Sequence, residues 1–143
     1  MMNTTQLDAY CKERGITPKA RLVIDQVRSL PPTRRVQSGT HNVACRYASK
    51  KMGLVIQAES HKNELPAIIG WERDQHTYEF YDQPPKVKLS YVGRGGKPVC
   101  YNATPDFFLL QEDFAGWVEC KTEEWLQSHV AEGSNLYVQD GNG

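Results

Sequence analysis

The stretch from Thr104 to Lys121, TPDFFLLQEDFAGWVECK, constrains the fold more than any other part of the chain. Its two apolar runs on either side of a polar turn predict two short strands that pair as a hairpin about residues 112–116. Because side chains alternate between the two faces of a strand, Glu119 and Lys121 point the same way. Asp106 can then lie opposite Glu119 or on the neighbouring strand position. We therefore expect two carboxylates and an ammonium in one patch.

Such a patch calls for a compensating cation. Carboxylates held close together repel each other, and the strands that carry them are otherwise apolar. Carboxylate oxygens are hard ligands, so a hard divalent metal ion is the candidate. The alternative interpretation of Asp106, Glu119 and Lys121 is a surface ion-pair cluster, worth little to stability and nothing to catalysis.

The composition is that of an ordinary globular domain, with 143 residues, 39% of them hydrophobic and 24% charged. No apolar run is long enough to span a membrane, and the N-terminus lacks the pattern of a signal peptide, so we expect a cytoplasmic protein. The four cysteines are scattered, with no C-x-x-C pair and no histidine at zinc spacing. They are expected to be free thiols.

The formal net charge of zero hides an asymmetry along the chain. No acidic residue occurs between Gln26 and Ala58, whereas the chain from Asp106 onward has eight acidic residues and one basic residue, Lys121. The first region can attract a polyanion, and the second concentrates carboxylates for a cation. For the first region, contact with DNA phosphates and a solvated arm are both open. The candidate DNA-binding residues are Arg34, Arg35, Arg46, Lys50 and Lys51.

The chain begins with two predicted helices, over residues 6–14 and 18–29, followed by a loop or basic arm over 33–51. A later helix is predicted within residues 59–74. Its Pro66 is tolerated only in the first turn, so the helix should start near residues 61–63 and place Glu64 in its opening turn. The helix dipole favours an ionised carboxylate there.

The remaining elements are mostly strands, predicted over 53–58, 78–81, 86–92, 98–102 and 135–138, with a helix over 123–130. This order predicts an α/β (α+β) fold, a mixed β-sheet flanked by helices. We divide it into an N-terminal helical segment and basic arm over 1–51 and a core over 52–143.

The motif around the hairpin resembles a known family. Pro-Asp and Glu-x-Lys, separated by twelve residues, form the signature of the PD-(D/E)xK nuclease superfamily, here Pro105, Asp106, Glu119 and Lys121. The blocks ESHKNEL, WERD, EFYDQPP, TPDFFLL and GWVECKTEEWL resemble the N-terminal nuclease domain of TnsA-type transposon endonucleases, from about Pro31 to Leu126. The resemblance implies a restriction-endonuclease-like fold and hydrolysis of phosphodiester bonds.

The resemblance also implies a set of site residues. Glu64, Asp106 and Glu119 would hold Mg²⁺, with Mn²⁺ as a substitute, and Lys121 would orient or help deprotonate the attacking water. Glu59 competes with Glu64 as the helix carboxylate. The family often has glutamine at the position of Glu119, which leaves that ligand open. The family's Gln-Pro pair, at residues 83–84, is expected to shape the sheet edge near the site.

The implied biology is cleavage of the 5′ strands at transposon ends in the bacterial cytoplasm, with the protein at the nucleoid when it binds DNA. The partners would be double-stranded DNA, a DDE transposase subunit and an AAA+ ATPase regulator, with no membrane. Two alternatives remain: a PD-(D/E)xK restriction or repair nuclease, and a catalytically silent DNA-binding or transposase-docking module. TnsA-type proteins usually continue into a second domain or are fused to the transposase, so a fragment is expected.

Overall fold

The computed structural model describes residues 1–33, 35, 43–93 and 95–131, and these residues form four helices and seven strands. None of these helices has the length and apolar character needed to cross a membrane. The predicted strand over 135–138 lies outside the described residues. The fold combines helices with small antiparallel sheets, in line with the predicted α+β class.

The two N-terminal helices begin at capping residues that the sequence supplies. In α1 (Thr4–Glu13) the side chain of Asn3 accepts from the Gln6 N–H at 2.9 Å, and the Gln6 side chain accepts from the Asn3 N–H at 2.8 Å. This capping box starts the helix two residues before the predicted position. In α2 (Pro18–Ser29) Thr17 is the N-cap and Pro18 the first residue, as predicted.

Seven strands form three separate antiparallel sheets. The central sheet has the order β3 (Thr77–Asp82), β6 (Phe107–Gln111), β7 (Ala115–Val118). The other two are the hairpins β1 (Cys45–Ser49) with β2 (Leu54–Ala58), and β4 (Val87–Val92) with β5 (Pro98–Ala103). Every pair between these strands is antiparallel, so the described residues do not form the single mixed sheet that we predicted.

The prediction of a loop or arm throughout residues 33–51 is wrong for its last part, because Cys45–Ser49 is strand β1. The turn to β2 is fixed by Glu72, whose carboxylate accepts from the Ser49 hydroxyl at 2.6 Å and from the Lys50 and Lys51 N–H groups at 3.0 and 3.1 Å. The strand has little apolar bulk, which hides it in the sequence. The predicted boundary between residues 51 and 52 lies within this turn.

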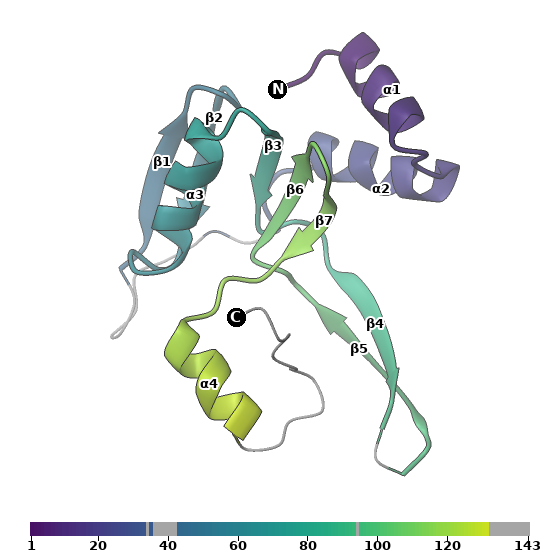
Figure 1. The fold of residues 1–143 in the computed structure, drawn as a ribbon, viewed down its shortest axis with the longest axis vertical. Coiled ribbons are helices and arrows are strands. Elements are labelled where there is room, and N and C mark those ends of the chain that lie inside the picture. Colours follow the sequence, from purple (N-terminus) through teal and green to yellow (C-terminus); the bar gives the residue numbers. More distant parts are fainter. Residues whose placement is uncertain (34, 36–42, 94, 132–143) are drawn as a thin grey trace.

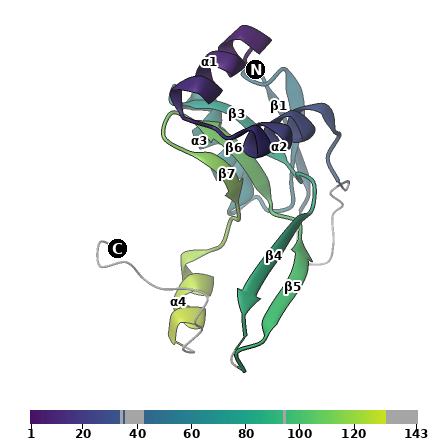
Figure 2. The same ribbon diagram turned by 90° about the vertical axis from the view of Figure 1, so that its right-hand side faces the viewer.

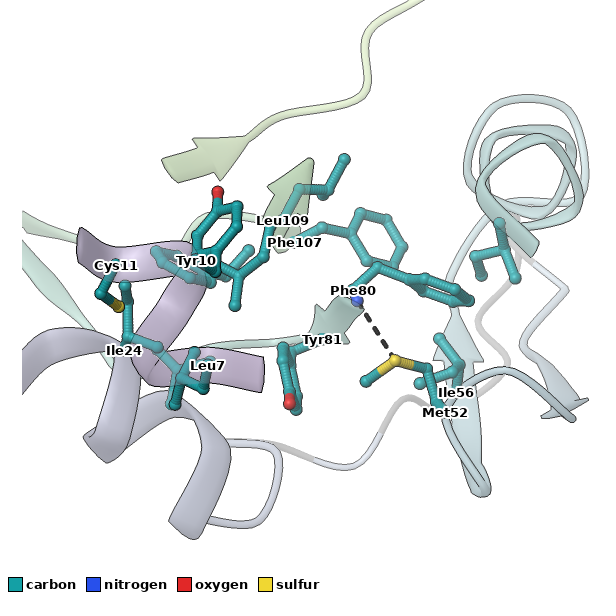
Figure 3. Close-up of a cluster of buried hydrophobic side chains, with 14 of the residues drawn as sticks. Leu7, Tyr10, Cys11, Ile24, Met52, Ile56, Phe80, Tyr81, Phe107 and Leu109 are labelled. Carbon is teal, nitrogen blue, oxygen red and sulfur yellow. Dashed lines mark hydrogen bonds between the residues drawn. The ribbon is translucent and has the colours of Figure 1, made fainter. Parts of the chain in front are cut away.

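A single cluster of buried apolar side chains joins the N-terminal helices to the strands (Figure 3). Leu7 of α1 and Ile24 of α2 lie in the same cluster as Phe80 of β3 and Phe107 of β6. Phe80 and Phe107 have no exposed surface. The N-terminal helices are therefore part of the core and not an appendage to it.

Helix α3 (Glu64–Arg73) packs on the central sheet through Trp71, whose ring centroid lies 5.9 Å from that of Phe80 and 4.9 Å from that of Phe107. It begins one residue after the predicted start, because the Ser60 hydroxyl accepts from the Lys62 and Asn63 N–H groups and holds them in a turn. The helix with β1 and β2 lies on one side of the sheet, and α1 and α2 lie on the other (Figure 1). The β4–β5 hairpin and α4 (Glu123–Ala131) extend from one end of this body (Figures 1 and 2).

Candidate active site

Asp106 and Glu119 lie at the open end of the β6–β7 hairpin. Asp106 directly precedes β6, Glu119 directly follows β7, and the last register pair of the two strands is Phe107 with Val118. Continuing that register by one residue would put Asp106 opposite Glu119, and the charge of Glu119 acts on Asp106. The turn is tighter than predicted, with the Gln111 N–H donating to the Phe114 carbonyl. The predicted pairing of the two strands is confirmed.

Asp106 is held from both neighbouring strands. Its Oδ2 accepts from the Cys120 N–H at 2.8 Å, and its carbonyl oxygen accepts from the Gln83 N–H at 2.9 Å. Two main-chain bonds from opposite sides fix both the backbone and the carboxylate. Asp106 therefore has a defined direction before any ligand binds.

Gln83 carries backbone strain next to this carboxylate. Its φ is 44°, in the left-handed region that a residue with a Cβ rarely adopts, and only 1% of the residue is exposed. Thr33 holds the segment, with its N–H donating to the Gln83 carbonyl and its hydroxyl to the Pro84 carbonyl, both at 2.9 Å. These contacts support the predicted role of residues 83–84 in shaping the sheet edge.

Lys121 lies close to Glu119, although β7 ends at Val118 and neither residue belongs to the strand in which we predicted them. Its Nζ is 3.2 Å from Glu119 Oε1 and 5.4 Å from the centre of the Trp125 ring at the start of α4. The side chains of Lys121 and Glu119 are 33% and 56% exposed. An exposed ion pair contributes little to stability, so stability alone does not explain this arrangement.

The patch has an excess of negative charge that acts on Asp106. Burial raises the pKa of Asp106 above its usual range, and the charges of Glu119 and Glu59 raise it further. The Cys120 N–H and Lys121 act in the opposite direction without cancelling the rise. Burial and the nearby Asp106 raise the pKa of Cys120 to about 12, so its thiol stays protonated at neutral pH.

Both candidate helix carboxylates lie near this patch. Glu64 is the first residue of α3, in the opening turn as predicted, and is 6% exposed. Its Oε2 accepts from the Glu59 N–H at 2.7 Å, and its charge contributes to the raised pKa of Cys120. Glu59 is half-buried, and its charge acts on Asp106. The choice between Glu64 and Glu59 therefore stays open.

The carboxylates of this patch are suitable ligands for Mg²⁺, although they do not converge on one point. Among the described residues, no three His, Cys, Asp or Glu side chains converge closely enough to hold a metal ion. Mg²⁺ keeps several waters and is commonly bound by one or two carboxylates together with substrate phosphate oxygens. Asp106 and Glu119, at adjacent strand ends, supply two carboxylates of this kind.

An open pocket of about 720 Å³ lies beside the patch, between the start of α3 and the segment from β7 to α4. Glu119 and Lys121 line it on one side, and Lys62 and Asn63 on the other. Asp106 is not among its lining residues. A ligand in this pocket can therefore reach Lys121 and Glu119 directly.

The predicted DNA-binding residues differ in what their side chains do. Lys51 Nζ donates to three main-chain carbonyls, those of Trp71, Asp74 and Thr77, at 2.6, 2.6 and 2.7 Å. An ammonium has three N–H donors, so this geometry assigns Lys51 to the end of α3 and not to a phosphate.

The other basic candidates stay available. Arg35, Arg46 and Lys50 are exposed, and Arg34 lies outside the described residues. Sequence reasoning missed the Cys120 N–H that orients Asp106 and the Trp125 ring beside Lys121. The available signal was the position of Cys120 between Glu119 and Lys121, because successive residues of an extended segment point in opposite directions.

The chain matches no protein-family model and no curated protein. Its function is therefore inferred from the geometry of the site together with the sequence motif.

Proposed function

We propose that this protein is a metal-dependent DNA endonuclease of the PD-(D/E)xK type, with a restriction-endonuclease-like fold. The observation that carries the proposal is the position of Asp106 and Glu119 one residue beyond Phe107 and Val118, the last register pair of the β6–β7 hairpin, with the Lys121 ammonium 3.2 Å from Glu119. These are the residue types that phosphodiester hydrolysis requires.

In this proposal Asp106 and Glu119 bind Mg²⁺, or Mn²⁺ in its place, and a further carboxylate comes from Glu64 at the start of α3 or from Glu59, which follows β2. When bound, the metal acts as a Lewis acid and lowers the pKa of a coordinated water. Asp106 is held in place by the Cys120 N–H, so it needs no rearrangement to act as a ligand. Burial is the main cause of the raised pKa of Asp106, and the charges of Glu119 and Glu59 add to it; a divalent cation beside the carboxylate would act in the opposite direction.

Lys121 orients the attacking water and offsets charge on the phosphate in this mechanism. Its contacts with Glu119 and the Trp125 ring keep the ammonium at the pocket wall. A lysine suits this role because a single ammonium can approach one oxygen and exchange a proton, whereas a guanidinium stays charged.

The sequence motifs extend the proposal to a biological role, the cleavage of 5′ strands at transposon ends alongside a DDE transposase and an AAA+ ATPase. That role places the protein in the bacterial cytoplasm, at the nucleoid when bound to DNA. A restriction or repair nuclease would use the same chemistry. Nicking of duplexes that carry transposon ends, compared with duplexes that lack them, separates these two roles.

One observation favours a second candidate, a catalytically silent DNA-binding module. No three ligand side chains converge in the described residues, and Glu64 is bonded to the Glu59 main chain. Such a module would bind DNA without binding Mn²⁺ and without nicking it.

The test is the nicking of supercoiled plasmid in Mg²⁺ by the wild-type chain and by Asp106→Asn and Lys121→Met. We expect both variants to lose nicking. Glu112→Gln is the matched control, because Glu112 is an exposed carboxylate at the opposite end of the same hairpin, paired with His76. Nicking by Asp106→Asn at the wild-type rate would rule out the proposed site.

A further inference from the structure

The β4–β5 hairpin stands apart from the body of the protein. Among the described residues its two strands pair only with each other, and both views show it projecting from one end (Figures 1 and 2). The residues of its two strands are exposed except Val87 and Ala103 at its base, which are half-buried. A two-stranded ribbon of this kind gains little stability by itself. We therefore expect the projecting hairpin to contact a partner molecule.

The register divides the side chains of the hairpin between two different faces. Directly paired residues share a face, which groups Leu89 with Tyr101 and Tyr91 with Val99 on an apolar side. Tyr91 and Tyr101 contact each other edge to face, with ring centroids 6.2 Å apart. The opposite face carries the pairs Lys88 with Asn102, Ser90 with Cys100 and Val92 with Pro98, so its polar part, here called the polar face, is the half nearest the base.

The charge of this region has one sign. No acidic residue occurs from Gln83 to Pro105, while the same stretch contains Lys86, Lys88, Arg94 and Lys97. A ribbon without carboxylates does not repel a polyanion anywhere along its length. A protein partner of ordinary mixed charge would not require that absence.

We propose that the polar face of the β4–β5 hairpin enters the major groove of duplex DNA, with Lys88 and Asn102 at the base edges. A six-residue ribbon is about 20 Å long, and the major groove, about 12 Å wide, admits a two-stranded ribbon. Lysine pairs with the acceptors of guanine, asparagine with adenine, and serine with either base. The Lys88–Asn102 pair with Ser90 therefore presents the side chains that read bases.

The hairpin also has a direct connection to the candidate active site. Gln83 precedes it and Asp106 follows it, and the Gln83 N–H bonds to the Asp106 carbonyl at 2.9 Å, closing its base. A ribbon of about 20 Å spans about six base pairs. The hairpin would thus set which bases lie a few positions from the bond that is cut.

The identity of the ligand as DNA rests on the proposed function. The test distinguishes a failure of the hairpin proposal from a failure of the proposed function. Binding of a fluorescein-labelled 30-base-pair duplex is measured by anisotropy in EDTA, so that no cleavage and no metal site contribute. In the double variant Lys86→Glu, Lys88→Glu we expect at least about tenfold weaker binding and a less steep salt dependence. The double variant Lys12→Glu, Lys19→Glu makes the same change of charge on exposed positions of α1 and α2 and should bind nearly as the wild type.

Three results would overturn the inference: no binding of the duplex by the wild type, equal binding by the hairpin variant, or an equal loss in the control. Leu89→Ser with Tyr101→Ser, examined by light scattering, tests the apolar face. A dimer that dissociates in this variant, with binding unaffected by the lysine changes, would make the hairpin an interface between copies. If Asp106→Asn still nicks DNA while the hairpin variant fails to bind, the hairpin inference stands and the proposed site does not.

Discussion

Two acidic clusters on the central sheet satisfy their charges in opposite ways. Glu79 of β3 has no exposed surface, and its carboxylate accepts from Arg28 Nε at 3.1 Å, Arg28 Nη2 at 3.2 Å, the Tyr81 hydroxyl at 2.6 Å and the Met2 N–H at 2.6 Å. Asp106 has one nearby ammonium, that of Lys121, which also pairs with Glu119. The charges of Glu119 and Glu59 act on Asp106 as well. The first cluster is closed by the chain itself, and the second retains negative charge.

We interpret this difference as that between a structural carboxylate, Glu79, and a proposed metal ligand, Asp106. A buried charge without a partner destabilises a fold strongly, which explains why Glu79 has four donors from three segments of the chain. Burial and the charges of Glu119 and Glu59 disfavour the ionised form of Asp106. This is the setting in which we propose that a cation binds.

The largest expected effect comes from Asp106→Asn. We expect the nicking rate to fall about 10³-fold, equivalent to about 4 kcal/mol in the barrier. The free energy of unfolding at pH 7 should stay the same or rise. The raised pKa of Asp106 means that the folded state opposes its ionisation, so a neutral isostere removes that opposition. Single-turnover nicking and urea denaturation measure the two quantities, and a parallel loss of both would assign Asp106 to the fold.

Glu79→Gln should show the reverse pattern, a loss of stability without a loss of chemistry. It leaves the Arg28 guanidinium in a buried site without its counter-charge, at a cost of about 3 kcal/mol. Urea denaturation of this variant, of Arg28→Met and of the double variant gives the coupling energy. Nicking per folded molecule should be unchanged, and additive losses would show that the two residues do not act as a pair.

Lys51→Met should cost about 2 kcal/mol of stability, because three main-chain carbonyls lose a charged donor. Its DNA affinity, corrected for the folded fraction, should equal that of the wild type. The neighbouring Lys50→Met has an exposed side chain and should keep full stability. If Lys51→Met lowers the salt dependence of DNA binding, Lys51 contacts a phosphate and this prediction is wrong.

The smallest expected effect is a shift in pH dependence. A cation needs ionised Asp106, so binding should weaken as pH falls through a pKa that lies above the usual aspartate range. Glu119→Gln removes a proposed ligand, so binding should weaken at every pH. It also removes a charge that raises the pKa of Asp106, so the acid limb of the normalised binding curve should move to lower pH. Mn²⁺ binding measured from pH 4.5 to 8 tests the sign, and a shift to higher pH would contradict it.

The features that could be predicted from the sequence depend on patterns among neighbouring residues. The apolar runs on either side of a polar turn were enough to pair β6 with β7 and to bring Asp106 and Glu119 to adjacent strand ends. Thr17-Pro18 and the position of Pro66 located two helix starts to within a residue or two. These features depend on backbone preferences of a few neighbouring residues.

Features that depend on distant partners were not predicted. Strand β1 forms because Glu72, more than twenty residues away, binds the turn after Ser49. Lys51 belongs to a basic run in the sequence, yet its ammonium donates to three main-chain carbonyls, those of Trp71, Asp74 and Thr77. The division into three small sheets likewise follows from packing between distant segments.

The most direct test of the central claim is a calorimetric titration of Mn²⁺ into the wild-type chain, Asp106→Asn and the control Glu112→Gln at pH 7.5. The titration tests the ligands that the protein itself supplies, with waters in place of substrate phosphate oxygens, and it needs no partner protein. The account predicts saturable binding by the wild type and the control, with none by Asp106→Asn. Equal binding by all three proteins, or none by the wild type, would contradict a cation site at Asp106.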